Sequence, residues 1–120
     1  MRAILVVDDE APLLELLQAI LEDEGYRVAV AFNGHEALVV LARQPVDIVI
    51  SDIMMPVFDG VRLCQAMQQQ PEYRNIPVIL ASAVGPPKLP ADCHCAAFLS
   101  KPFDYELLLA TVARLLERSG

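Results

Sequence analysis

The chain has 120 residues, of which 55% are apolar, and a formal net charge of -7 at pH 7. This length suits one globular domain with one core, so we expect residues 1–120 to form a single domain. Binding to nucleic-acid phosphates requires clustered Lys and Arg. The nine such residues here are scattered, so we expect no direct contact with nucleic acid.

Short apolar runs rich in β-branched residues alternate along the chain with longer segments of helical period. Proline residues open or end several helical segments, and a glycine closes the first of them. In chain order we expect a strand over Ile4–Val7, a helix between Pro12 and Gly25, a strand over Tyr26–Ala31, a helix between Asn33-Gly34 and Pro45, a strand over Val46–Ser51, a helix over Val61–Gln69, a strand over Ile76–Ala81, a strand over Ala96–Ser100 and a last helix with Asp104 as its N-cap. This alternation is typical of a parallel sheet covered by helices on both faces.

One stretch fits the pattern badly, namely residues 83–95, where the fourth helix of such a fold would lie. Gly85, Pro86, Pro87 and Pro90 restrict backbone angles and remove hydrogen-bond donors across it. We therefore expect the fourth helix to be short, irregular or missing.

Polar residues follow the carboxyl ends of four predicted strands. They are Asp8, Asp9, Asp52, Ser82 and Lys101. Ligands of an open parallel sheet bind beyond this edge, where the strand order reverses. Three carboxylates brought together repel one another unless a cation neutralises them, and magnesium is the usual hard ion for oxygen ligands. The acidic cluster therefore predicts a Mg²⁺ site, although Asp8-Asp9 could instead cap a helix and Asp52 could be a turn residue.

Five blocks of sequence, in this order and at this spacing, resemble the bacterial response-regulator receiver domain of two-component (phosphorelay) signalling. The blocks are Ile4–Glu10, Asp47–Pro56, Asp59-Gly60, Pro77–Ala83 and Leu99–Phe103. The resemblance covers nearly the whole chain except residues 83–95. It implies a flavodoxin-like (βα)5 fold, which is a doubly wound parallel five-stranded sheet in the order 2-1-3-4-5.

The resemblance also implies a phosphoacceptor role for Asp52. Its carboxylate is expected to take a phosphoryl group from the phosphohistidine of a histidine kinase or histidine phosphotransferase, or from a small acyl phosphate. Lys101 is expected to lie beside the phosphoryl oxygens, aimed inward by a cis peptide to Pro102. Ser82 resembles the switch hydroxyl of the family and Phe98 its switch aromatic, although core packing is the plainer role for Phe98.

For Mg²⁺, the resemblance implies a ligand set made of carboxylates and one main-chain oxygen. Asp9 is expected to bind the ion directly and Asp8 mostly through a water. Asp52 and the main-chain carbonyl of Met54 are expected to complete the protein ligands. The phosphoryl group would then switch the surface formed by the fourth and fifth strands with the last helix.

The cysteines and the N-terminal apolar run predict a cytoplasmic protein. Cys93 and Cys95 are too close for an easy unstrained bridge, and the total of three cysteines is odd, so we expect reduced thiols. The run that ends at Val7 is too short for a signal peptide or a membrane span. A zinc site at Cys93-His94-Cys95 is disfavoured, because these neighbours cannot easily all face one ion.

Three other functions compete with the active receiver. A pseudo-receiver would keep the fold and signal through protein contacts without phosphorylation, and the unusual residues 83–95 favour it. A phosphatase of the haloacid dehalogenase kind needs a second Asp where this chain has Met54, so we expect no hydrolysis of external substrates. Nucleotide-binding modules need a glycine-rich loop after the first strand, which is missing. Many receivers use the fourth helix to dimerise or to contact an output domain, so a homodimer and the output partner stay open here.

Overall fold

A computed structural model describes residues 1–86 and 88–119, so Pro87 and Gly120 lie outside the described residues. The elements, in chain order, are β1 (Ala3–Val7), α1 (Ala11–Asp23), β2 (Arg27–Ala31), α2 (Gly34–Arg43), β3 (Ile48–Asp52), α3 (Gly60–Gln68), β4 (Val78–Ser82), β5 (Ala97–Ser100) and α4 (Tyr105–Ser119). None of the helices in these two ranges has the length and apolar character needed to cross a membrane.

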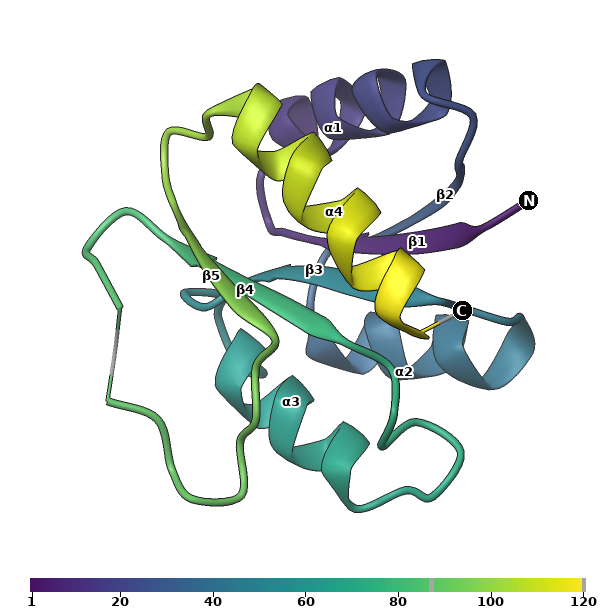
Figure 1. Ribbon diagram of the computed structural model, residues 1–120. Helices are drawn as coiled ribbons and strands as arrows, with labels where there is room; N and C mark the ends of the chain where they lie inside the picture. The colour runs from purple at the N-terminus through teal and green to yellow at the C-terminus, as the bar shows by residue number, and fades with distance from the viewer. Residues whose placement is uncertain (87, 120) are drawn as a thin grey trace.

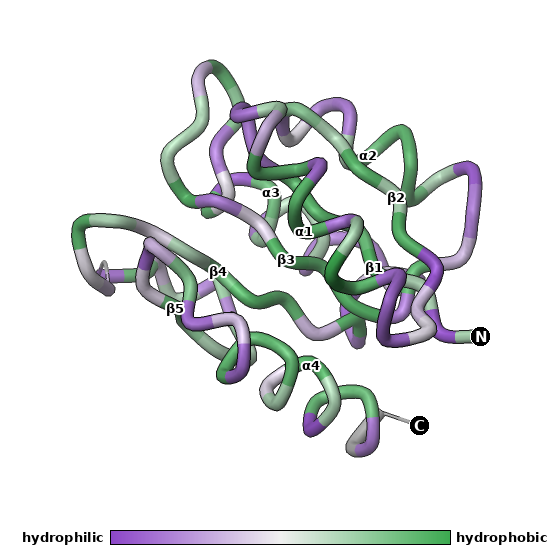
Figure 2. The backbone as a smooth tube through the Cα atoms, turned by 90° about the horizontal axis from the view of Figure 1, so that it is seen from above, coloured by the Kyte–Doolittle hydropathy of each residue, from purple (hydrophilic) through white to green (hydrophobic). Residues whose placement is uncertain are grey.

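The five strands form one parallel sheet in the order β2-β1-β3-β4-β5, which confirms the predicted flavodoxin-like topology. Helices α1 and α4 cover one face of the sheet and α2 and α3 cover the other (Figure 1). The three central strands β1, β3 and β4 are buried on both faces, and most of their residues are hydrophobic (Figure 2). This burial explains why they consist of continuous apolar runs rather than alternating ones.

Side-chain caps begin three of the helices where the sequence places Asn or Asp. Asn33 Oδ1 accepts a hydrogen bond from the Glu36 amide at 2.8 Å, and Asp59 Oδ1 accepts one from the Arg62 amide at 2.9 Å. Asp104 Oδ1 accepts one from the Leu107 amide at 3.1 Å, which confirms the predicted N-cap. Each cap satisfies an amide that has no partner within its helix.

The fourth helix of the (βα)5 pattern is missing among the described residues between β4 and β5. This confirms the expectation drawn from the proline and glycine residues of this stretch. Two strand ends differ from the prediction, because Asp52 and Ser82 are the last residues of β3 and β4 instead of the first residues beyond them. Both residues therefore gain the rigidity of the sheet ladder.

Candidate phosphoacceptor site

A lysine and two carboxylates from three strand ends meet at the carboxyl edge of the sheet. Lys101 Nζ lies 2.7 Å from Asp8 Oδ2 and 3.3 Å from Asp52 Oδ2. The two aspartates are 2% and 7% exposed, so the charges interact largely out of water. A cavity of about 310 Å³ opens at this point. Its lining residues are Asp9, Glu10, Asp52, Met54, Ser82, Ala83 and Lys101.

Backbone hydrogen bonds between neighbouring strand ends hold these groups in place. The Ile53 amide donates to the Ala81 carbonyl at 2.9 Å, and the Lys101 amide donates to the Ser82 carbonyl at 3.0 Å. The Lys101–Pro102 peptide is cis, as the resemblance implies. The sheet therefore sets the positions of Asp52 and Lys101 through the main chain, before any side-chain contact is counted.

Burial and the neighbouring charges shift the pKa of Asp52 upward, and its carboxylate partners shift the pKa of Lys101 upward. Burial raises the pKa of Asp52, the Asp8 carboxylate raises it further, and Lys101 offsets only part of this. Burial opposes the charged form of Lys101, but its hydrogen bonds and charge attraction to Asp8 and Asp52 outweigh this effect and raise its pKa. Lys101 is therefore a charged ammonium group at neutral pH and neutralises part of the negative charge of Asp8 and Asp52.

An Asp52→Asn substitution should stabilise the fold at neutral pH, in magnesium-free buffer, by about 1 kcal/mol. The raised pKa of Asp52 means that the folded chain holds this proton more tightly than the unfolded chain. Stability therefore falls as the pH rises from the ordinary value of 3.8 through the raised folded pKa, and the loss persists above it. Asn carries no such penalty.

The check is a series of urea denaturation midpoints for wild type and Asp52→Asn between acidic and neutral pH. The two curves should converge at the acid end and separate toward neutral pH. An asparagine variant that is less stable than wild type at neutral pH would show that the pairing with Lys101 outweighs the burial of the Asp52 charge.

Hard oxygen ligands gather beside Asp52 in a group that fits Mg²⁺. The carboxylates of Asp8, Asp9 and Glu10 offer oxygen atoms within 4.8 Å of one another. No other group of three His, Cys, Asp or Glu side chains that could hold a metal ion occurs in residues 1–86 and 88–117. Asp8 accepts hydrogen bonds from the Glu10 amide (3.0 Å) and from Lys101, which favours an indirect role for it. Asp9 is exposed and lines the cavity, as does Met54.

The group of three carboxylates differs in two ways from what the sequence suggested. Glu10 joins the group although it was not among the predicted ligands, and its only sequence signal is its place after Asp8-Asp9. Glu10, and neither aspartate, is the N-cap residue of α1, and it caps without a side-chain hydrogen bond. The helix-cap interpretation of Asp8-Asp9 is therefore wrong. Among the described residues, Cys93 and Cys95 belong to no cluster of three side chains that could hold a metal ion.

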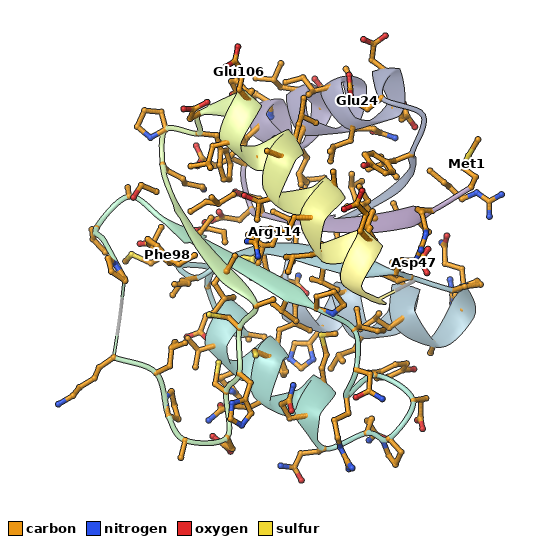
Figure 3. All side chains as sticks on the ribbon, in the orientation of Figure 1. Met1, Glu24, Asp47, Phe98, Glu106 and Arg114 are labelled. Carbon is orange, nitrogen blue, oxygen red and sulfur yellow. The ribbon has the colours of Figure 1, made fainter. Side chains whose placement is uncertain are left out.

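Ser82 and Phe98 lie on neighbouring strands but in different surroundings. Ser82 is 1% exposed, lines the site cavity, and its Oγ accepts a hydrogen bond from the Val84 amide at 3.1 Å. Phe98, labelled in Figure 3, lies on β5 opposite Leu80 and packs half-buried against the core between the sheet and helices α2 and α3. The structure thus brings Ser82 to the site, whereas Phe98 does not line the site cavity.

The loop from Ile53 to Asp59 is held down by an aromatic residue that sequence reasoning did not single out. Phe58 is 8% exposed, the Arg62 guanidinium carbon lies 4.8 Å from its ring centroid, and the His35 ring centroid lies 4.5 Å away. Val57 beside it adopts a positive φ of 69°, which is costly for a β-branched residue. The loop that carries Met54 is therefore anchored at its far end.

Comparison with known proteins gives consistent matches. The family model described as the response regulator receiver domain matches residues 4–113. The chain is 40% identical to the response regulator Rre1 of Synechocystis, over 97% of this chain and 52% of that protein. It is 39% identical to the response regulator PleD of Caulobacter vibrioides, over 93% of this chain and 25% of that protein. The chain thus spans about half, or less, of the length of these relatives.

Solved structures agree with the sequence matches. The signal receiver domain of a signal transduction histidine kinase from Syntrophus aciditrophicus superposes with a TM-score of 0.87 at 36% identity, covering 98% of this chain and 91% of that one. The chemotaxis protein CheY4 of Vibrio cholerae superposes with a TM-score of 0.89 at 31% identity, covering 96% of this chain and 98% of that one. On the strand order, the strand-end site and these matches, the chain belongs to the response regulator receiver domain family of two-component signalling.

Proposed function

We propose that this receiver domain is an active phosphoacceptor in a phosphorelay and that Asp52 is the residue phosphorylated. The observation that carries the proposal is the Asp52 carboxylate at the floor of an open cavity, with the Lys101 ammonium 3.3 Å away. A buried carboxylate with one cation beside it and access from solvent can attack a phosphorus atom. We also propose that residues 1–120 act as one receiver domain and do not themselves contact nucleic acid.

In the proposed reaction an Asp52 oxygen forms a bond to phosphorus while the bond from phosphorus to the donor histidine nitrogen breaks. The electron pair of the broken bond returns to the imidazole ring, so no further reactant is needed. Lys101 donates hydrogen bonds to the phosphoryl oxygens, which stabilises their charge during transfer and afterwards. The domain is its own substrate in this step, since the phosphoryl group stays on Asp52 until hydrolysis.

From the resemblance to receiver domains, we propose that Asp9 holds Mg²⁺ directly, that Asp8 holds it through a water, and that Asp52 and the Met54 main-chain carbonyl complete the protein ligands; the nearby carboxylates of Asp8, Asp9 and Glu10 support a site of this kind. A bound Mg²⁺ would supply charge neutralisation and orientation of the phosphoryl oxygens. Because Asp8 is already bonded to Lys101, its carboxylate also keeps the lysine aimed at Asp52.

An apolar groove next to the site suits the partner that delivers the phosphoryl group. A cavity of about 520 Å³ is lined by apolar side chains of α1 and of the segment after β5, and it shares Lys101, Glu10 and Ala83 with the site cavity. Its apolar lining consists of Pro12, Leu13, Leu16, Ala83, Pro102, Phe103 and Tyr105. A helix of a histidine kinase or phosphotransferase seated there would bring its phosphohistidine to Asp52.

For the signal, we infer that the phosphorylated state is read by Ser82 and Phe98. The Ser82 hydroxyl would leave the Val84 amide and donate to a phosphoryl oxygen, drawing the start of the segment after β4 toward the site. Phe98 would then turn inward, which would remodel the surface of β4, β5 and α4. Ser82→Ala should be phosphorylated without producing this change.

The decisive experiment is intact mass spectrometry after incubation with acetyl phosphate, with and without Mg²⁺, on wild type and Asp52→Ala. An active receiver gains one phosphoryl group in a magnesium-dependent manner, and the variant gains none. Absence of any gain in wild type would instead support the pseudo-receiver, which signals through contacts without phosphorylation.

The phosphoryl group on Asp52 should be long-lived, because the positions two residues beyond Asp52 and Ser82 both carry apolar side chains, and the first of them, Met54, lines the site cavity. Met54 and Val84 are 61% and 77% exposed, and neither can orient an attacking water. A Met54→Asn and Val84→Glu double variant should lose the phosphoryl group about tenfold faster or more, since polar groups there can position water and accept its proton. The decay of the phosphorylated mass after donor removal measures this.

The matched control for this prediction is Met54→Leu with Val84→Ile, which keeps both positions apolar and should preserve the wild-type lifetime. Equal lifetimes in wild type and the polar double variant would refute the idea that these two side chains limit hydrolysis.

A further inference from the structure

Residues 89–96 form a strap that covers the core beside α3, where the family fold would place its fourth helix. Within this strap, Cys93 is 5% exposed, and Leu89 and Cys95 pack half-buried against the same core. The strap is tied to α3 by two side chains. Gln65 Nε2 donates to Asp92 Oδ1 at 2.9 Å, and Cys64 Sγ donates to the His94 carbonyl at 3.4 Å.

The strap is weakly held compared with a helix in the same place. It has no run of helical hydrogen bonds. Within the strap, the Cys93 amide donates to the Pro90 carbonyl, and the amide of its last residue, Ala96, donates to the Val78 carbonyl on β4. Cys93 is its one buried side chain, and the hydrogen bond of Gln65 to Asp92 is exposed to solvent. Segments with few buried contacts and few backbone hydrogen bonds open at much lower free energy than the sheet they cover.

Phe98, the residue proposed above to respond to phosphorylation, shares a packing surface with this strap. Phe98, Leu89 and Cys95 all pack on the core cluster that contains Cys93 and Cys64, and the strap ends two residues before Phe98. A rotation of the Phe98 ring therefore changes the packing surface on which the strap lies. Because protein interiors are close-packed, such a change is transmitted to neighbouring side chains and is not absorbed by empty space.

We propose that residues 89–96 undock from α3 when Asp52 is phosphorylated, so that the output of this receiver includes uncovering the α3 side of its core. The inference rests on the proposed function, because it needs the phosphoryl group and the response of Phe98. The family fold would place its fourth helix over this surface. In this chain the same surface is closed by a removable strap.

Two buried thiols make the undocking directly measurable. Cys64 is fully buried, and burial raises its pKa to about 12. Burial also raises the pKa of Cys93. A thiol that is both covered and protonated reacts slowly with an alkylating reagent, because the thiolate is the nucleophile. Release of the strap exposes Cys93 to water and removes the burial that is the main cause of its raised pKa, so its alkylation accelerates for two reasons.

The experiment is timed alkylation with iodoacetamide of wild type and Asp52→Ala, each with Mg²⁺ and with or without acetyl phosphate. Intact mass reports phosphorylation and peptide mapping reports alkylation of Cys93 in the same sample. Phosphorylation should accelerate alkylation of Cys93 in wild type by about tenfold, within the usual range of coupling between two sites. Asp52→Ala should show the slow rate under both conditions.

A second variant tests the strap without using the site. Gln65→Ala removes the hydrogen bond to Asp92 and should raise the basal alkylation rate of Cys93 while leaving phosphorylation by acetyl phosphate unchanged. Gln69→Ala, at an exposed glutamine just after the same helix, is the matched control and should leave both rates unchanged.

The possible results separate the two proposals. If wild type gains the phosphoryl group but Cys93 is alkylated no faster, the strap does not undock and this inference is wrong, while the phosphoacceptor function stands. If wild type gains no phosphoryl group under any condition, both proposals fail together. Equal basal rates in Gln65→Ala and Gln69→Ala would also contradict the view that α3 holds the strap.

Discussion

Lys101→Met should slow phosphorylation of Asp52 by acetyl phosphate by about 100-fold to 1,000-fold, the usual loss when a preorganised donor to developing charge is removed. Lys101 Nζ lies 3.3 Å from Asp52 Oδ2 and 2.7 Å from Asp8 Oδ2, so in the proposed reaction it would stand beside the phosphoryl oxygens. Its loss would also raise the pKa of Asp52 further, because the attraction that lowers this pKa is removed. The initial rate of phosphoryl gain by intact mass, at saturating Mg²⁺, measures the effect.

The other lysine of the chain, Lys88, offers a matched control for this variant. Lys88 is exposed, so Lys88→Met makes the same chemical change away from the site and should leave the rate unchanged. Lys101→Arg should be phosphorylated little faster than Lys101→Met, because the planar guanidinium cannot replace a compact ammonium between two carboxylates. A Lys101→Met rate within about twofold of wild type would mean that the carboxylates and the metal perform the transfer without this lysine.

Gly60→Ala should destabilise the fold by about 3 kcal/mol and also impair phosphorylation. A Cβ atom at Gly60 would overlap the Asp52 carbonyl oxygen and come within 3.1 Å of the Ile53 Cα. Both obstacles belong to the backbone and cannot rotate away. The Gly60 amide also donates to the Ile53 carbonyl at 3.1 Å, so α3 begins in direct contact with the end of β3. Moving α3 to make room would therefore move Asp52.

Gly25→Ala separates this clash from the general cost of replacing glycine. A Cβ at Gly25 would meet no atom within 4 Å, and the penalty comes from its positive φ of 95°. We expect a loss of about 1 kcal/mol with unchanged phosphorylation, since Gly25 is remote from the site. Urea unfolding and the acetyl phosphate assay test both variants. Equal losses at the two glycines would show that the contact between α3 and β3 is more compliant than its geometry indicates.

Much of the fold could be predicted from the sequence, because its signals are local. Continuous apolar runs indicated buried strands, Asp104 and Asn33-Gly34 marked helix starts, and the prolines and glycine of residues 83–95 excluded a regular helix there. These signals arise from backbone angles, missing amide donors and capping side chains, which act within a few residues. Strand order did not come from such signals but from the resemblance to a known family.

The site was predictable in its residues but only partly in its geometry. Asp8, Asp9, Asp52, Ser82 and Lys101 were identified because they follow strands that end at one edge of a sheet. Nothing local indicated that Lys101 would bind Asp8 more closely than Asp52, since these residues are 93 positions apart. Glu10 was missed as a member of the carboxylate group, because its side-chain direction depends on the loop between β1 and α1.

The amino-acid sequence by itself determined which segments form strands and helices, that the helix between β4 and β5 is missing, and which charged side chains stand at the strand ends. Only the tertiary structure decided which of those side chains meet, that Gly60 touches the backbone of Asp52, and that Cys64 on α3 binds the His94 carbonyl in the strap. The physical reason is range. Backbone preferences and capping act over a few neighbouring residues, whereas contacts across the sheet depend on strand register and on how loops pack after the chain has closed on itself.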